Sequence, residues 1–185
     1  MAKGSNSCDT ISGIPETFAR LRSFEGEPGE FWPKFLSGLI DLAKAGSGGI
    51  LIRNSSEDWK SIAVQPKGLK ILDNVNLAGH DFNEDVKLGV RNGVTARSIE
   101  EGKRETAHRV LVDLTPEGSN TQALALLFLP EQEAISLTDV MIRLDLAREI
   151  AASYSLQRRL SRAEVSVGSF ASILDLLQVL DARQR

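Results

Sequence analysis

The side chains best able to carry out chemistry in this 185-residue chain are two histidines and one cysteine. His80 and His108 lie far apart in the sequence, and neither belongs to an HExxH motif or a His/Cys cluster, so the sequence predicts no metal site. Cys8 stands in the polar stretch KGSNSCDT, where we interpret it as a solvated thiol. A single cysteine also excludes an internal disulfide.

Serine, histidine and aspartate are all present, but the sequence contains no GxSxG elbow to support a nucleophilic serine. The glycine-rich segment Gly46–Gly49 precedes a predicted strand, whereas a phosphate-binding loop follows a strand and opens a helix. We interpret it as the end of a helix, with Gly46 in a left-handed cap. The sequence therefore predicts no catalytic residue, no metal and no cofactor.

The composition is that of a globular chain, with 42% hydrophobic and 25% charged residues and a net charge of −3. Positive charge does not gather in any segment, so we expect no nucleic-acid partner. No stretch approaches the roughly 18 consecutive apolar residues of a membrane span, and the N-terminus lacks an apolar signal core. We expect a cytoplasmic protein segment that makes no direct membrane contact.

The first half of the chain predicts helices and a hairpin. A short helix is expected over Pro15–Phe24 and an amphipathic one over Phe31–Ala45, whose apolar side chains recur at helical spacing. Gly49–Arg53 and Trp59–Gln65 read as two strands joined by a loop of about five residues. Trp59 has the opposite parity to Ile62 and Val64 on the second strand, so we expect it to anchor the edge of the sheet.

The middle of the chain predicts a helical insertion followed by two strands. A short helix is expected near Leu69–Leu77, and a helical tract from Asn83 that is either two short helices or one broken near Asn92 and Gly93. Glu105–Leu114 is a strand with alternating character. One face carries Thr106, His108, Val110, Val112 and Leu114, and the other carries Glu105, Arg109 and Asp113. The apolar run Gln122–Leu129 predicts a central strand covered on both faces.

A long helical tract begins at Ser136 and continues almost to Arg185. Its first part has an apolar stripe that suits a core. Farther on, apolar residues recur at alternating spacings of four and three, which average 3.5 residues and predict pairing with another helix. This seam consists of Leu156, Leu160, Ala163, Val167, Phe170, Leu174 and Leu177. A bend or break is expected near Val165–Ser169, which would allow the alternative that the tail folds back onto its own domain.

Two segments, Phe31–Pro66 and Gln122–Ala151, resemble a GAF domain. In that family a helix leads through a small-residue turn into a strand and its hairpin partner, and an apolar strand later leads into a long terminal helix. The resemblance implies an α+β fold with an antiparallel sheet of five or six strands. The helices Phe31–Ala45 and Ser136–Tyr154 should pack on one face of it, and PAS domains are the competing fold.

The resemblance also implies a cavity between the sheet and the helical insertion, which is where that family holds small ligands. His108 is the best candidate to line it, the alternative being a core histidine bonded to backbone. The cysteines of the methionine-sulfoxide-reducing branch and the Asn-Lys-Phe-Asp-Glu signature of the cyclic-nucleotide branch are absent. Cys8 is also poorly placed to anchor a pigment, as a cysteine does in the light-sensing branch.

We therefore predict a flexible leader over residues 1–29, a GAF-like domain over 30–155 and a C-terminal linker or coiled-coil helix over 156–185. The expected function is a non-catalytic regulatory or sensory module that forms a homodimer through its C-terminal helices, with an unidentified small-molecule ligand left open. One alternative is a structural adaptor domain of a larger bacterial secretion (membrane-fusion) or transcription-regulating protein. Another is a small hydrolase or reductase. The tail resembles helices that lead into a second domain, so we expect a fragment of a longer chain.

Overall fold

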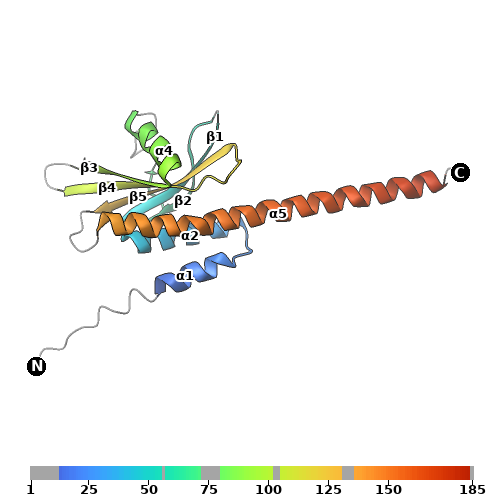
Figure 1. Cartoon of the computed structure of the whole chain (residues 1–185), viewed down its shortest axis with the longest axis horizontal. Coiled ribbons are helices and arrows are strands. Elements are labelled where there is room, and N and C mark those ends of the chain that lie inside the picture. The colour runs from blue at the N-terminus through green and yellow to red at the C-terminus, as the bar shows by residue number, and fades with distance from the viewer. Residues whose placement is uncertain (1–12, 56, 72–79, 102–104, 131–135, 184–185) are drawn as a thin grey trace, which may run out of the picture.

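A computed structural model describes residues 13–55, 57–71, 80–101, 105–130 and 136–183 (Figure 1). Cys8 and most of the predicted helix Leu69–Leu77 lie outside the described residues. In chain order the elements are α1 (Gly13–Arg22), α2 (Pro28–Ala43), β1 (Ser47–Asn54), β2 (Lys60–Gln65), α4 (His80–Asn92), β3 (Val94–Glu101), β4 (Glu105–Asp113), β5 (Thr121–Pro130) and α5 (Leu137–Arg183).

The strands form one antiparallel sheet in the order β2-β1-β5-β4-β3. Helices α2 and α5 lie on one face of it, and α4 lies on the other (Figure 1). This confirms the predicted α+β arrangement, including the hairpin of β1 with β2 and the placement of both long helices on the same face. The apolar strand β5 is central, as expected, because it pairs with β1 and β4.

Helix α2 ends two residues earlier than we expected. The left-handed residue is Lys44, with φ of 54°, and not Gly46. The N–H of Gly46 instead donates to the carbonyl oxygen of Phe128 on β5, at 2.9 Å. The chain must leave the helix before this bond can form, so the reversal falls on Lys44.

The larger core lies between the sheet and helices α1, α2 and α5. At its centre the rings of Phe31 on α2 and Tyr154 on α5 are stacked, with centroids 3.7 Å apart and planes 6° from parallel. The hydroxyl of Tyr154 donates to the carbonyl oxygen of Gly26 at 2.8 Å, and burial raises the pKa of this hydroxyl. Leu21 of α1 is also buried in this core, so the short helix within the predicted leader packs on the domain.

The segment after α4 differs from the prediction, because it is a strand. The helix ends at Asn92, and Gly93 follows with φ of 83°, in the left-handed region that glycine adopts without a Cβ clash. Val94–Glu101 then pairs with β4 along the edge of the sheet. The predicted break near Asn92 and Gly93 is confirmed, but the prediction of a second helix after it was wrong. The segment has few apolar residues, so its sequence alone does not indicate a strand. Its hydrogen-bonded pairing with β4 holds it in the extended conformation.

Helix α5 is continuous from Leu137 to Arg183, so the expected break at Val165–Ser169 was wrong. Its first part covers the sheet, and the remainder projects well beyond the domain (Figure 1). The described helices include none that is both long enough and apolar enough to cross a membrane.

Candidate functional site

The face of the sheet beneath α4 has its own core, separate from the one under α2 and α5. Strand residues contribute Leu51, Leu111, Leu124 and Leu126, and α4 contributes Phe82 and Val86. The helix comes close to β4 at Gly89, where an added Cβ would lie 2.5 Å from Cδ2 of Leu111. The lack of a side chain at Gly89 therefore permits close helix–sheet packing. The residues that make up this second core are all apolar.

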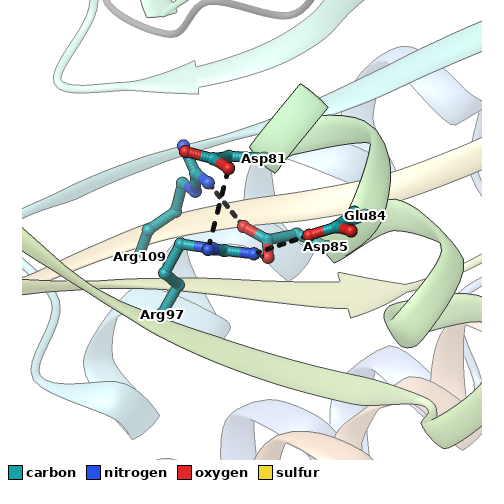
Figure 2. Close-up of polar contacts among 5 residues, drawn as sticks. All are labelled: Asp81, Glu84, Asp85, Arg97 and Arg109. Atoms are coloured by element: carbon teal, nitrogen blue, oxygen red, sulfur yellow. Dashed lines mark hydrogen bonds and ion pairs between the residues drawn. The ribbon is translucent and has the colours of Figure 1, made fainter. Parts of the chain in front are cut away.

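A buried ion cluster lies at the β3 and β4 side of this second core (Figure 2). Arg97 and Arg109 are direct neighbours in the register of these two strands. Asp85 of α4, whose side chain is only 5% exposed, accepts hydrogen bonds from Nε of Arg97 at 2.8 Å and from Nη2 of Arg109 at 2.5 Å. One carboxylate thus holds two like-charged guanidinium groups side by side and ties α4 to the sheet.

Two more acidic residues of α4 lie around the outer side of this cluster. A carboxylate oxygen of Asp81 is 3.9 Å from Nη1 of Arg97, and one of Glu84 is 3.7 Å from its Nη2. Both acidic side chains are at least half exposed, so these contacts are weak beside the buried pair. The hydrogen bond to Asp85 raises the pKa of Arg97, with smaller contributions from the nearby carboxylates.

Two buried N–H donors on the α4 face have no hydrogen-bond acceptor among the described residues. They are Nε1 of Trp59 and Nε of Arg109. Both groups lie around the ring of Phe82, whose centroid is 6.0 Å from the Trp59 ring and 5.8 Å from Cζ of Arg109. A buried donor without an acceptor is costly. An acceptor from outside the described residues would satisfy each of these two donors.

Trp59 is part of this second core and not the edge anchor that we expected. It precedes β2 and is 7% exposed. The guanidinium of Arg53 lies over its indole, with Cζ 4.5 Å from the ring centroid, and the Phe82 ring meets it edge-on. The alternation was expected to place Trp59 opposite both Ile62 and Val64, but Val64 packs against the same core as Trp59, because the register of β2 with β1 shifts at Ile62. Only the position of α4 shows that this face is covered.

His108 lies on the face of β4 that also carries Val110 and Val112, both of which pack in the core under α2 and α5. Helix α4 covers the opposite face, where Arg109 and Leu111 lie. The alternation of side chains along β4 was predicted correctly. The face that carries His108, however, is not the one that α4 covers. Nδ1 of His108 is 3.3 Å from Oγ of Ser98. Its role in ligand binding stays a prediction, and its position does not favour that role.

The other predicted chemical residues do not assemble into a site. His80 is the first residue of α4. Across the residues that the structure describes, no group of three or more His, Cys, Asp or Glu side chains is arranged to hold a metal ion. The cluster of Asp85, Arg97 and Arg109 was missed. The available signal was the alternation in β4, which placed Arg109 on the face away from His108.

A second candidate surface is the outward side of α5. Val140, Leu144, Ala147, Ala151 and Tyr154 form its inner row and are buried against the domain. A second row, here called the outer row, carries Ile142, Leu146, Leu156 and Leu160, which are 55%, 67%, 57% and 57% exposed. Val140 and Ile142 are two residues apart, which is about 200° around a helix. The outer row therefore points away from the domain, and at Leu156 it becomes the predicted seam.

No protein-family model and no curated protein sequence matches this chain. Solved structures do match. The GAF domain of a phosphoenolpyruvate-protein phosphotransferase from Coxiella burnetii has a TM-score of 0.55 and 10% identity, covering 85% of this chain and 99% of that one. The phycoerythrobilin-bound GAF domain of a cyanobacterial phytochrome has a TM-score of 0.53 and 13% identity, covering 83% and 100%.

A longer structure matches with a higher score. Bacteriophytochrome RpBphP3 from R. palustris has a TM-score of 0.61 at 9% identity, and the match covers 91% of this chain but 42% of that one. At such low identity these likenesses concern the fold. Together with the sheet order and the helices on both faces, they show that this chain has the fold of a GAF domain.

Proposed function

We propose that this chain is a non-catalytic regulatory module that pairs with a second copy of itself through α5 and relays a signal along that helix to further domains. The observation that carries this proposal is the outer row of α5. Four large apolar side chains in it are more than half exposed, although the helix is already packed against the domain on its other side. Exposed apolar side chains that line up in this way are typical of a partner surface.

The outer row continues into the part of α5 that leaves the domain. From Leu156 to Leu177 its seven apolar positions keep the 3.5-residue average of a paired helix. Burying them between two chains would remove several hundred Å² of surface from water, or about 10 kcal/mol at about 25 cal/mol per Å². The entropy lost when two chains associate and their side chains become ordered offsets much of this free energy, so we expect a dimer of moderate affinity.

The fold-back alternative is disfavoured by the geometry of α5. It needs a reversal near Gly168, and the helix runs through that residue without interruption. The outer row also lies on the side of the helix opposite the inner row, so the domain that carries it cannot cover it. A second chain is the simplest remaining partner.

Analytical ultracentrifugation tests the pairing. The double variant Leu174→Asp plus Leu177→Asp places two charges in the seam, outside the domain, and should sediment as a folded monomer where the wild type is a dimer. A matched control, Ser161→Asp plus Ser172→Asp, adds the same charge away from the seam and should remain dimeric. Far-UV circular dichroism checks that all three proteins are folded. A wild type that is monomeric at high micromolar concentration would rule out the pairing.

A second candidate function, small-ligand binding beneath α4, is favoured by the two buried donors of Trp59 and Arg109. A ligand with oxygen or ring-nitrogen acceptors would satisfy both. Native mass spectrometry of the purified protein is the test. A small molecule that adds mass to the wild type and is lost from Trp59→Phe would support binding, with Trp32→Phe as the control. Absence of any added mass would favour the structural adaptor without ligand.

A further inference from the structure

We infer that the second copy of this chain lies parallel to the first and in register with it, so that both domains are at the same end of the paired helices. This inference rests on the pairing through α5 that is proposed above. It goes further by fixing the direction and register of the partner, which determine whether two GAF-like domains lie side by side or at opposite ends.

The register follows from the heptad positions along the seam. In a heptad, position d is followed by a after four residues, and a by d after three. The spacings therefore place Leu156 at d, Leu160 at a and Ala163 at d. Arg159, just before Leu160, is then at position g, and Glu164, just after Ala163, is at position e. These two positions flank the apolar contact between paired helices, where charges select the direction of the partner.

A parallel, in-register pair brings Arg159 of each chain beside Glu164 of the other, because a g residue faces the e residue five positions later in the partner. Symmetry makes this favourable contact twice. In an antiparallel pair, e residues face e residues and g residues face g residues, so Arg159 cannot meet Glu164 in any register. The antiparallel register that sets Leu156 against Leu174 also opposes the two Glu164 residues. Charge complementarity therefore favours the parallel pair.

The contacts of Arg159 within its own chain leave it able to form this pair. One N–H of its guanidinium, on Nη1, donates to the carbonyl oxygen of Glu117 in the β4–β5 turn at 2.8 Å. A guanidinium has five N–H donors, so further donors serve a carboxylate of the partner. The residue is exposed, and it lies where α5 leaves the domain.

Two polar residues, Glu149 and Ser153, occupy the positions between Leu146 and Leu156 on the same side of α5, and they indicate where close pairing begins. Glu149 and Ser153 continue the same spacing toward the domain and are both exposed. In a parallel pair each meets its own copy, and two Glu149 carboxylates repel each other. We therefore place the close contact from Leu156 onward, with the two helices diverging beside the domains. An antiparallel pair over the whole row would instead bury Glu149 among apolar residues, which costs more.

Disulfide cross-linking tests the direction. In a Cys8→Ser background, Ala163→Cys and Leu177→Cys are each introduced alone, both at position d and about 21 Å apart along the helix. A parallel, in-register pair brings each cysteine next to its own copy, so both variants should form covalent dimers under mild oxidation. An antiparallel pair can do this only near its crossing point, so at most one variant would cross-link. The control Ser161→Cys, away from the seam, should not cross-link.

Charge reversal gives an independent measurement. Arg159→Glu and Glu164→Arg should each raise the dimer Kd several-fold, and the combination should restore it toward the wild-type value. A wild type that is monomeric by sedimentation would defeat the pairing itself. A wild-type dimer in which only one cysteine variant cross-links, or in which the charge-reversed double variant is not restored, would retain the pairing and overturn the parallel register.

Discussion

Oδ2 of Asp85 on α4 lies 2.5 Å from Nη2 of Arg109 on β4. Only 5% of the Asp85 side chain and 12% of the Arg109 side chain are exposed, so this is a buried ion pair. It joins the helix to a strand next to the centre of the sheet. A buried pair of this kind is not in itself a source of stability, but removal of one partner leaves the other charge uncompensated.

The first prediction concerns this pair. Asp85→Asn keeps the shape of the side chain and removes its charge, so we expect it to lower the free energy of unfolding by about 3 kcal/mol. The control is Asp81→Asn, whose exposed carboxylate lies 3.9 Å from Arg97, and it should change stability by less than about 0.5 kcal/mol. Urea unfolding followed by circular dichroism measures both. Equal stabilities for the two variants would contradict the role assigned to Asp85.

The second prediction concerns Tyr154, which is the only tyrosine in the chain, so that tyrosinate absorbance reports on it alone. Burial raises the pKa of its hydroxyl in the folded state, whereas the unfolded value is about 10. The stability that this group contributes is therefore complete below about pH 10 and is lost as the pH rises through the folded pKa. A spectrophotometric titration should give a midpoint above 10 in buffer and near 10 in urea.

A matched variant isolates that effect. Tyr154→Phe keeps the stack on Phe31 but removes the ionisable hydroxyl and its bond to Gly26. Its stability should be lower at neutral pH, by about 1 kcal/mol, and should fall less steeply than that of the wild type above about pH 10. If the stability of both proteins fell equally steeply above about pH 10, other groups would be the cause of the loss of stability at alkaline pH.

The third prediction concerns the aromatic centre of the larger core. Phe31 is fully buried and lies between the rings of Phe35 and Tyr154. Phe31→Ala should lower the free energy of unfolding by about 3–5 kcal/mol, because a cavity replaces the ring. The neighbouring Trp32 is only partly buried, so Trp32→Ala should cost clearly less. Chemical unfolding of both variants provides the comparison, and the reverse order would refute this packing.

The fourth prediction concerns the left-handed residue that ends α2. Lys44 has φ of 54°, a conformation that costs about 1 kcal/mol for residues with a Cβ. Lys44→Gly and Lys44→Ala both remove the long side chain, and they differ only in the Cβ. We therefore expect the glycine variant to be more stable than the alanine variant by about 1 kcal/mol, as measured by thermal or urea unfolding. An alanine variant of equal stability would mean that the left-handed cap carries no strain.

Local patterns in the sequence were enough to predict most of the elements. Periodicity and turn residues act over a few neighbouring positions, and they identified the stripe of α2, the hairpin of β1 with β2, the apolar strand β5 and the helical tract of α5. The break expected within α5 was wrong. The same information missed β3. Its residues carry a weak pattern of their own, and the strand is held by pairing with β4.

The sequence also separated the two faces of β4 correctly, with His108 on one and Arg109 on the other. It could not decide which face α4 covers, because that depends on how the chain crosses the sheet between β2 and β3. For the same reason Asp85 and Arg109, 24 positions apart, could not be matched before the fold was known. On α5 the heptad spacing was visible in the sequence, but only the packing of the inner row on the domain showed that the outer row points outward.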